Sequence, residues 1–136
     1  LLYDDYAHHP TEIKKTLNAF RKRFPKSRLV CIFQPHTYSR TKSLFDQFIT
    51  SFQSADTAIL TNIYPSLREK ADSTVSSKLL VDRIQVSHRD VLFLPELSHV
   101  IEYIKRQQYG KEVVIITMGA GDIYKINEKL KIKNEK

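Results

Sequence analysis

The chain has 136 residues, of which 41% are hydrophobic and 27% charged. This length suits one domain, expected over residues 1–136, with a hydrophobic core that does not need disulfides or a metal ion for its stability. Its apolar runs are far too short to cross a membrane, and its start leads directly into two aspartates rather than a secretion signal, so we expect a cytoplasmic location. The net charge of +7 allows an anionic partner, but the basic residues are spread over several segments among acidic ones, and we interpret most of them as solvated surface.

Short apolar runs alternate with amphipathic segments along the chain. The expected strands are residues 1–3, 29–34, 57–61, 91–94 and 113–118. This alternation is typical of a parallel sheet covered by helices. It predicts a doubly wound α/β fold with a mostly parallel sheet of five to six strands and helices on both faces. Cys31, inside the second run, is expected to be a buried thiol rather than a nucleophile.

Between the strands, hydrophobic residues recur at three- and four-residue spacing, which predicts amphipathic helices. Two of these segments follow Pro10 and Pro95, and proline suits the first turn of a helix. The stripes expected to face the core are Ile13, Leu17, Phe20 and Phe24; Leu44, Phe45, Phe48, Ile49 and Phe52; Val75, Leu79, Leu80 and Ile84; Leu97, Val100, Ile101 and Ile104; and Ile123, Ile126 and Leu130. Residues 64–74 form the longest candidate for an irregular loop.

Chemically rich segments each follow a predicted strand directly. They are residues 4–10, 34–40, 62–65 and 119–122. Because the carboxyl ends of parallel strands meet at one edge of a sheet, where helix N-termini also point, these four loops are expected to converge on a binding site. No phosphate-binding glycine loop, nucleophile elbow or metal-ligand spacing accompanies them. The residues therefore suit recognition, and we assign neither a catalytic residue nor a metal ligand.

The first of these loops carries two pairs of polar residues. Asp4 and Asp5 could accept hydrogen bonds from sugar hydroxyls or could cap the following helix. His8 and His9 are adjacent, which does not suit joint ligation of one metal ion in the usual geometry. Such a pair is more often a helix cap and a polar loop residue.

The second and last loops give one stronger and one weaker indication. Arg40 is expected at the start of a helix, where the helix dipole already favours anions. A guanidinium there indicates recognition of a carboxylate or phosphate, worth roughly 1.5–3 kcal/mol, although an ordinary surface arginine is the alternative. Gly119 and Gly121 lack the third glycine of a dinucleotide fingerprint and suit a tight strand-to-helix turn. Two further histidines outside these loops, His88 and His99, are interpreted as surface or hydrogen-bonded residues.

Several of these motifs resemble the Mur ligase family of peptidoglycan synthesis. The stretch Asp-Asp-Tyr-Ala-His-His-Pro-Thr-Glu at residues 4–12 is similar to the start of that family's C-terminal domain. The stretch Phe-Gln-Pro-His-Thr-Tyr-Ser-Arg-Thr at residues 33–41 is similar to the branch that attaches L-alanine to UDP-N-acetylmuramate. The resemblance continues in order through Ile63-Tyr64-Pro65, Arg68-Glu69, Val75-Ser76-Ser77 and Met118-Gly119-Ala120-Gly121-Asp122-Ile123, and so spans the chain to about residue 130.

The resemblance implies an enzyme of three domains, of which this chain would be the third. The N-terminal UDP-sugar domain and the central ATPase domain would lie on other parts of the polypeptide. The whole ligase would join L-alanine to the lactyl carboxylate of UDP-N-acetylmuramate through an acyl phosphate, using ATP and Mg²⁺. This chain alone would be inactive and would bind neither ATP nor L-alanine tightly.

The resemblance also implies roles for individual residues. Asp5 would accept a hydrogen bond from the ATP ribose, and Arg40 would bind the carboxylate of L-alanine. The L-alanine wall would be completed by Tyr6, His8 and His36, and the site would be lined by Asp4, His9, Thr37, Gly119 and Gly121. A histidine could assist removal of the amine proton, but the sequence does not say which.

Two departures from the family pattern accompany these roles. Some members carry arginine where Thr37 stands, so a second contact to the carboxylate could be missing or mediated by water. Residues 67–74 lack an expected glycine, which leaves the conformation of that loop open.

Three other interpretations stay open. A related ligase that attaches a whole recycled peptide shares the first motif, although residues 34–40 argue against it. A basic nucleic-acid-binding α/β module would need one continuous positive face with interleaved aromatics, and we expect no nucleic-acid or membrane partner. An independent α/β hydrolase or transferase would need a nucleophile or base that the sequence does not reveal.

Overall fold

The computed structural model describes residues 1–134, and it describes the side chains of residues 1–131. Within this range five strands form one sheet in the order β1-β5-β2-β3-β4, and every neighbouring pair is parallel. The strands are β1 (Leu2–Asp5), β2 (Arg28–Phe33), β3 (Thr57–Leu60), β4 (Val91–Phe93) and β5 (Val113–Met118). The predicted parallel sheet is confirmed, and β1 is longer than expected, so that both aspartates of the first motif belong to the strand.

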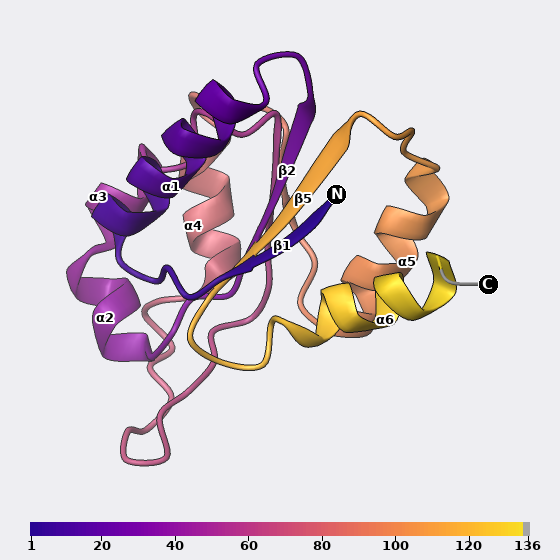
Figure 1. Cartoon of the computed structure of the whole chain (residues 1–136). Coiled ribbons are helices and arrows are strands. Elements are labelled where there is room, and N and C mark those ends of the chain that lie inside the picture. The colour runs from indigo at the N-terminus through magenta and orange to yellow at the C-terminus, as the bar shows by residue number, and fades with distance from the viewer. Residues whose placement is uncertain (135–136) are drawn as a thin grey trace.

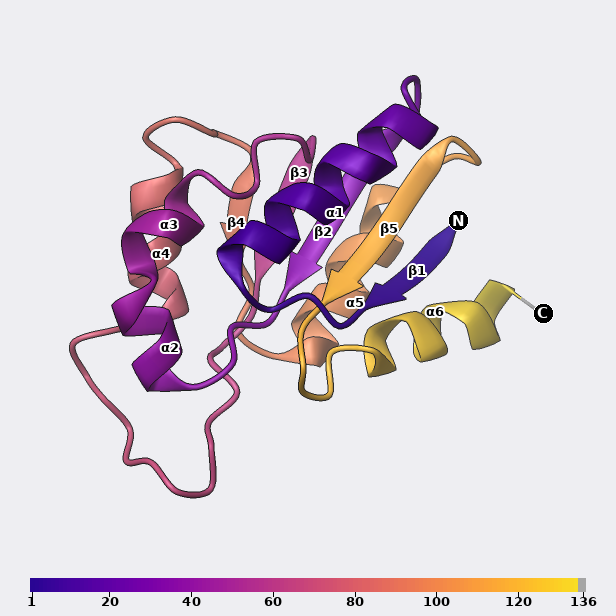
Figure 2. The same ribbon diagram turned by 60° about the vertical axis from the view of Figure 1, so that its left-hand side comes forward.

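Helices cover both faces of the sheet (Figure 1). One face carries α1 (Pro10–Arg23), α2 (Tyr38–Ser43), α3 (Phe45–Ile49) and α4 (Ser77–Ile84), and the other carries α5 (Leu97–Gln107) and α6 (Lys125–Asn134). Figure 2 shows the first layer from its own side, with α1 running in front of the sheet. This arrangement is the doubly wound fold that the alternation of segments predicts.

The core has two halves, one on each side of the sheet. In β2, Leu29, Cys31 and Phe33 pack in the half beneath α1, α3 and α4, whereas Val30 and Ile32 pack in the half beneath α5 and α6. All five are fully buried because a central parallel strand is covered on both faces. Burial raises the pKa of the Cys31 thiol far above its usual value, and the Asp5 carboxylate adds to this. Cys31 is therefore the buried, unreactive thiol that was expected.

The start of α1 is fixed by a capping box. The His9 side chain accepts a hydrogen bond from the Thr11 N–H (3.1 Å), and the Glu12 carboxylate accepts one from the His9 N–H (3.1 Å). Pro10 occupies the first helical position, where its missing N–H costs nothing. The interpretation of one of the paired histidines as a helix cap is confirmed.

Two details of the predicted helices differ from the structure. The stripe around Phe48 is divided, because Leu44 leaves the helical conformation between α2 and α3. The prediction that Leu79 faces the core is wrong, since its side chain is 45% exposed. α4 instead buries Ser77, Leu80, Val81 and Ile84, whose i, i+3, i+4, i+7 spacing turns Leu79 toward solvent.

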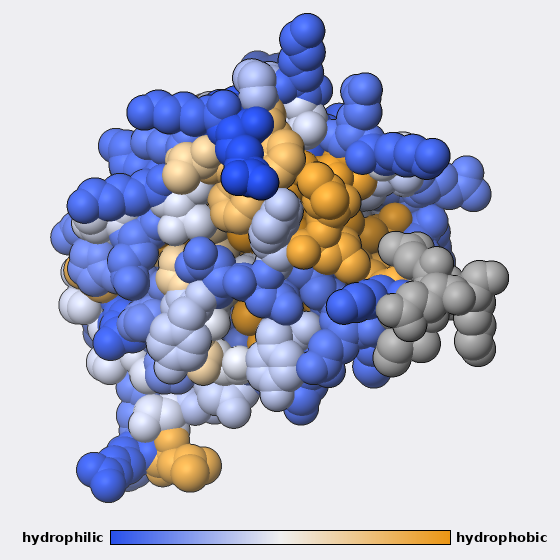
Figure 3. All heavy atoms as spheres, in the orientation of Figure 1, coloured by the Kyte–Doolittle hydropathy of each residue, from blue (hydrophilic) through white to orange (hydrophobic). Residues whose placement is uncertain are grey.

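Polar side chains cover most of the face seen in Figure 3, and a hydrophobic patch surrounds the N-terminus. Hydrophobic side chains that stay exposed include Leu1, Tyr6, Tyr64 and Leu67. None of the helices within residues 1–134 combines the length and the apolar character needed to cross a membrane.

Candidate functional site

The polar loops that follow β1, β2, β3 and β5 meet at the carboxyl edge of the sheet. Asp5 ends β1 opposite Met118, the last residue of β5, and the Gly119 N–H donates to the Asp5 carbonyl (3.2 Å). Beyond β2 and β3, His36 and Tyr64 form an isolated parallel bridge. The predicted convergence of these loops is confirmed.

The two aspartates of β1 have different surroundings. Asp4 Oδ1 accepts hydrogen bonds from the Thr117 hydroxyl and from Asn127 Nδ2 (3.1 Å), and both partners are buried. Asp5 Oδ1 accepts a hydrogen bond from the Ala7 N–H (2.7 Å), and its second carboxylate oxygen makes no hydrogen bond with the described residues. Asp4 therefore ties β1 to β5 and α6, whereas Asp5 keeps an acceptor available to a ligand.

Four rings form a row along this edge. Tyr6 meets His8 edge-on with ring centroids 5.6 Å apart, and His8 lies 6.4 Å from His36. His36 in turn stacks on Tyr64 at 5.8 Å with nearly parallel planes. The row combines three predicted site residues with Tyr64, which was not among the predicted site residues. Its position after the third strand placed it near the site, but only the packing reveals the stack on His36.

The surroundings of His36 disfavour a positive charge on its ring. Its Nδ1 is buried and has no hydrogen-bond partner among the described residues. Burial lowers the pKa of His36, and the nearby Arg40 guanidinium and His8 lower it further, while the Glu69 carboxylate acts in the opposite direction. At neutral pH His36 therefore presents a flat, neutral ring to the site.

The turn into α2 presents Arg40. Thr37 caps the helix, with its hydroxyl oxygen accepting from the Arg40 N–H (3.2 Å). Thr37 has a φ of +67°, which is unusual for a β-branched residue, and its N–H donates to the Tyr64 carbonyl (2.8 Å). The Arg40 guanidinium makes no ion pair or hydrogen bond with the residues whose side chains are described. A half-buried arginine without an internal partner, in the first turn of a helix, suits an external anion.

The irregular segment between β3 and α4 forms hydrogen bonds with the turn into α2. The Glu69 carboxylate accepts hydrogen bonds from the Tyr38 N–H (2.5 Å) and the Ser39 N–H (3.3 Å) at the start of α2. The Tyr38 N–H is the main reason that the pKa of Glu69 lies below its usual value. Lys42 adds an ion pair to Asp72 (3.3 Å). Apart from its place in the family motif, Glu69 could not be recognised from local sequence, because its partners lie about thirty residues away.

The profile of the family described as "Mur ligase, glutamate ligase domain" matches residues 1–121. The chain belongs to the Mur ligase family. A UDP-N-acetylmuramate–L-alanine ligase from Caldanaerobacter subterraneus subsp. tengcongensis is 48% identical over 133 residues, which cover 98% of this chain and 28% of that protein. The chain thus spans little more than a quarter of the curated relatives that it matches.

Solved structures of Mur ligases share the fold. A UDP-N-acetylmuramate-alanine ligase from Thermotoga maritima superposes with a TM-score of 0.76 at 26% identity, and the match covers 98% of this chain and 27% of that one. A murein peptide ligase from Psychrobacter arcticus gives the same TM-score at 24% identity, with 97% and 27% covered. The first of these also agrees in name with the sequence relatives, whereas the second shows the fold alone.

The described residues contain no cluster of metal ligands. Among them, no group of three or more His, Cys, Asp and Glu side chains could hold a metal ion.

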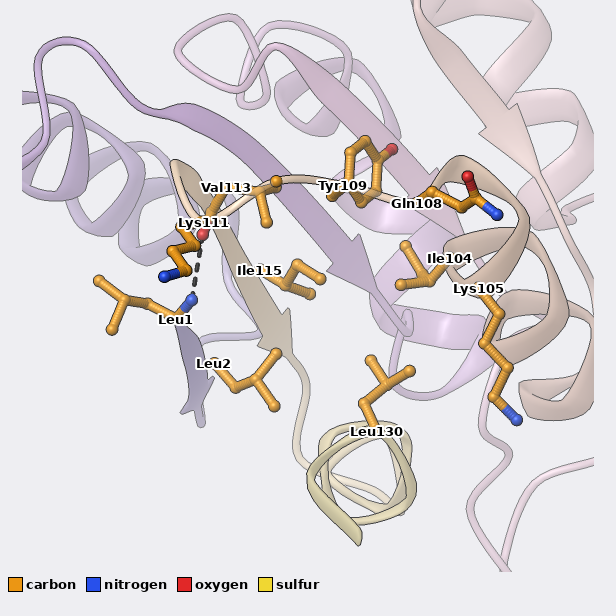
Figure 4. A pocket seen from close by; sticks show the side chains of 11 residues that line it. Leu1, Leu2, Ile104, Lys105, Gln108, Tyr109, Lys111, Val113, Ile115 and Leu130 are labelled. Carbon is orange, nitrogen blue, oxygen red and sulfur yellow. Dashed lines mark hydrogen bonds between the residues drawn. The ribbon is translucent and has the colours of Figure 1, made fainter. Parts of the chain in front are cut away.

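A hollow of about 600 Å³ lies away from this site, beside the N-terminus and between β5, α5 and α6 (Figure 4). Leu2, Ile104, Ile115 and Leu130 point into it from these elements. No carboxylate or imidazole is among the described residues that line it, and its charged groups are the N-terminal amine and two lysines.

The glycines beyond β5 let the backbone approach the row of rings. A Cβ on Gly121 would lie 2.7 Å from Gln34 Oε1 and 2.8 Å from two ring carbons of Tyr64. Gly119 has a φ of +153°, and a Cβ there would lie 3.1 Å from the Gln34 carbonyl oxygen. The close packing at Gly121 links the last loop to the stack of Tyr64 on His36.

We expect Gly121→Ala to destabilise the protein by about 1–3 kcal/mol, because overpacking must push the Tyr64 ring away from the glycine. Urea unfolding would measure the loss, and the NMR signals of the His36 ring should shift at the same time. Gly110→Ala is the matched control, since nothing lies within 4 Å of a Cβ there. Equal stability of the two variants would show that the Gly121 contact is not tight.

Proposed function

We propose that this chain is the C-terminal domain of a UDP-N-acetylmuramate–L-alanine ligase and supplies the wall that receives L-alanine and part of the ATP site. The observation that carries the proposal is the Arg40 guanidinium, which has no partner among the described side chains and lies near His36 in the row of rings. Support also comes from the curated relatives, which bear this enzyme's name at identities up to 48%.

Arg40 would bind the carboxylate of L-alanine. A guanidinium offers paired donors that match the two oxygens of a carboxylate, and its charge does not depend on pH in this range. The flat, neutral His36 ring would lie beside the small methyl side chain without competing for the carboxylate. Because the amino acid would be held by its carboxylate, its amine would be free to point at the acyl group that it attacks.

Asp5 would hold the nucleotide through its ribose. Its free carboxylate oxygen is an acceptor for a hydroxyl, while its other oxygen keeps the turn in place through the Ala7 N–H. ATP supplies the phosphoryl group that activates the UDP-N-acetylmuramate carboxylate. Mg²⁺ would accompany ATP in the whole enzyme, and within the described residues no group of three or more His, Cys, Asp and Glu side chains could hold a metal ion.

A chimeric enzyme tests the proposal. Residues 1–136 would replace the matching segment of the Caldanaerobacter relative, and the product would be followed by mass spectrometry together with ADP release. We expect ADP release that depends on both UDP-N-acetylmuramate and L-alanine, and no turnover by the isolated chain. A folded chimera whose ADP release does not depend on L-alanine, or turnover by the isolated chain, would contradict the proposal.

A further inference from the structure

The tautomer of His8 is fixed by the protein backbone. Its Nδ1 lies 2.9 Å from the Tyr6 carbonyl oxygen. A carbonyl can only accept a hydrogen bond, so Nδ1 carries the proton and donates it. In the neutral ring Nε2 is then left as a bare lone pair, which is the basic position of an imidazole.

The bare nitrogen belongs to a ring within the proposed L-alanine wall. His8 lies between Tyr6 and His36 in the row of rings, and its side chain is 23% exposed. Nε2 makes no hydrogen bond with any residue that the structure describes. The titratable groups around His8 are Tyr6 and His36 on either side, His9 in the cap of α1 and Glu12 in its first turn, with Glu12 Oε1 at 3.9 Å from Nδ1.

We propose that His8 Nε2 is the base that accepts a proton from the ammonium group of bound L-alanine; the inference rests on the function proposed above. One N–H proton passes to Nε2, and the freed lone pair attacks the carbonyl carbon of the acyl phosphate. The bond between that carbon and the phosphate oxygen then breaks, and phosphate leaves with the electron pair. The second proton lost by the new amide nitrogen goes to phosphate or water.

His36 is less suited to this task. One of its ring nitrogens, Nδ1, is buried, and its ring is stacked on Tyr64. Arg40 also acts against a positive charge on His36, whereas the acidic Glu12 side chain lies near His8. These surroundings lower the pKa of His36, which makes its ring a poor acceptor for the amine proton.

The tautomer can be tested on the chain itself without any ligand. Long-range ¹H–¹⁵N NMR spectra at pH 8 distinguish a protonated from a bare ring nitrogen. We expect the His8 signals to show a protonated Nδ1 and a bare Nε2. A protonated Nε2 would overturn the proposal, because that nitrogen could then only donate.

The chemical role can be tested in the chimera with two nucleophiles. His8→Asn keeps an N–H for the Tyr6 carbonyl but removes the base. It should lower the rate of L-alanine ligation about 10²- to 10⁴-fold and abolish the acidic limb of the pH profile. Hydroxylamine, which is largely unprotonated at neutral pH, should still trap the acyl group as a hydroxamate at the wild-type rate. His99→Asn, in the cap of α5, serves as the control.

Each other outcome of this test has a defined meaning. Retention of the acidic limb in His8→Asn, or its loss in His36→Asn alone, would overturn the assignment to His8. Equal losses with both nucleophiles would also overturn it, because they would indicate a structural role. If the wild-type chimera forms neither hydroxamate nor alanine product, the proposed function itself fails, and this result is distinct from a failure of the assignment.

Discussion

Arg40→Ala in the chimera should raise the KM for L-alanine about 10- to 100-fold while leaving the KM for ATP nearly unchanged. The guanidinium has no partner among the described side chains, so its loss should remove a charge-assisted contact to the ligand worth about 1.5–3 kcal/mol. The fold should tolerate the change for the same reason. Steady-state kinetics with each substrate varied in turn would measure both constants.

Two variants of the same helix serve as controls for this prediction. Arg40→Lys keeps the charge but loses the paired donors, so we expect an intermediate KM. Lys42→Ala removes a nearby cation that is already paired with Asp72, and should change neither KM appreciably. An unaltered KM for L-alanine in Arg40→Ala would show that Arg40 does not bind L-alanine.

Substitution of the two neighbouring aspartates should have opposite consequences. Asp5→Asn keeps an oxygen for the Ala7 N–H but removes the anionic acceptor, so the KM for ATP should rise about tenfold with little loss of stability. Asp4→Ala should lower the free energy of unfolding by about 1–3 kcal/mol, because Thr117 and Asn127 lose a shared acceptor. Its KM for ATP should stay near the wild-type value. Urea unfolding and ATP kinetics on both variants would measure these effects.

The reverse pattern of KM values would contradict this assignment of Asp5. If Asp4→Ala raised the KM for ATP and Asp5→Asn did not, the contact to the ribose would have to be assigned to Asp4. The two residues are adjacent and of the same type, and they differ in their contacts and in their burial, since Asp4 is exposed and Asp5 is half-buried.

The sequence predicted those features that depend on local patterning. Buried strands such as β2 are continuous apolar runs, and loops beyond parallel strands lie at one edge of the sheet, so the meeting of the loops that carry Asp5, His36 and Arg40 could be inferred. Leu79 was misplaced because the choice between two overlapping helical stripes depends on how α4 meets the sheet. No local pattern decides that choice.

Contacts between distant segments were beyond the reach of the sequence. Glu69 binds the start of α2 from a loop about thirty residues away, and Tyr64 acquires its role only by stacking on His36. The different contacts of Asp4 and Asp5 depend on the register of β1 with β5, which places Asp4 opposite Thr117. The positive φ of Thr37 accompanies a backbone hydrogen bond to Tyr64, and the residue type does not predict it.

A crystal structure of the chimera with L-alanine and a non-hydrolysable ATP analogue would test the central claim most directly. We expect the L-alanine carboxylate within hydrogen-bond distance of the Arg40 guanidinium, its amine near His8 Nε2, and the ribose at Asp5. L-alanine bound away from Arg40 with its carboxylate held by other residues would contradict the account.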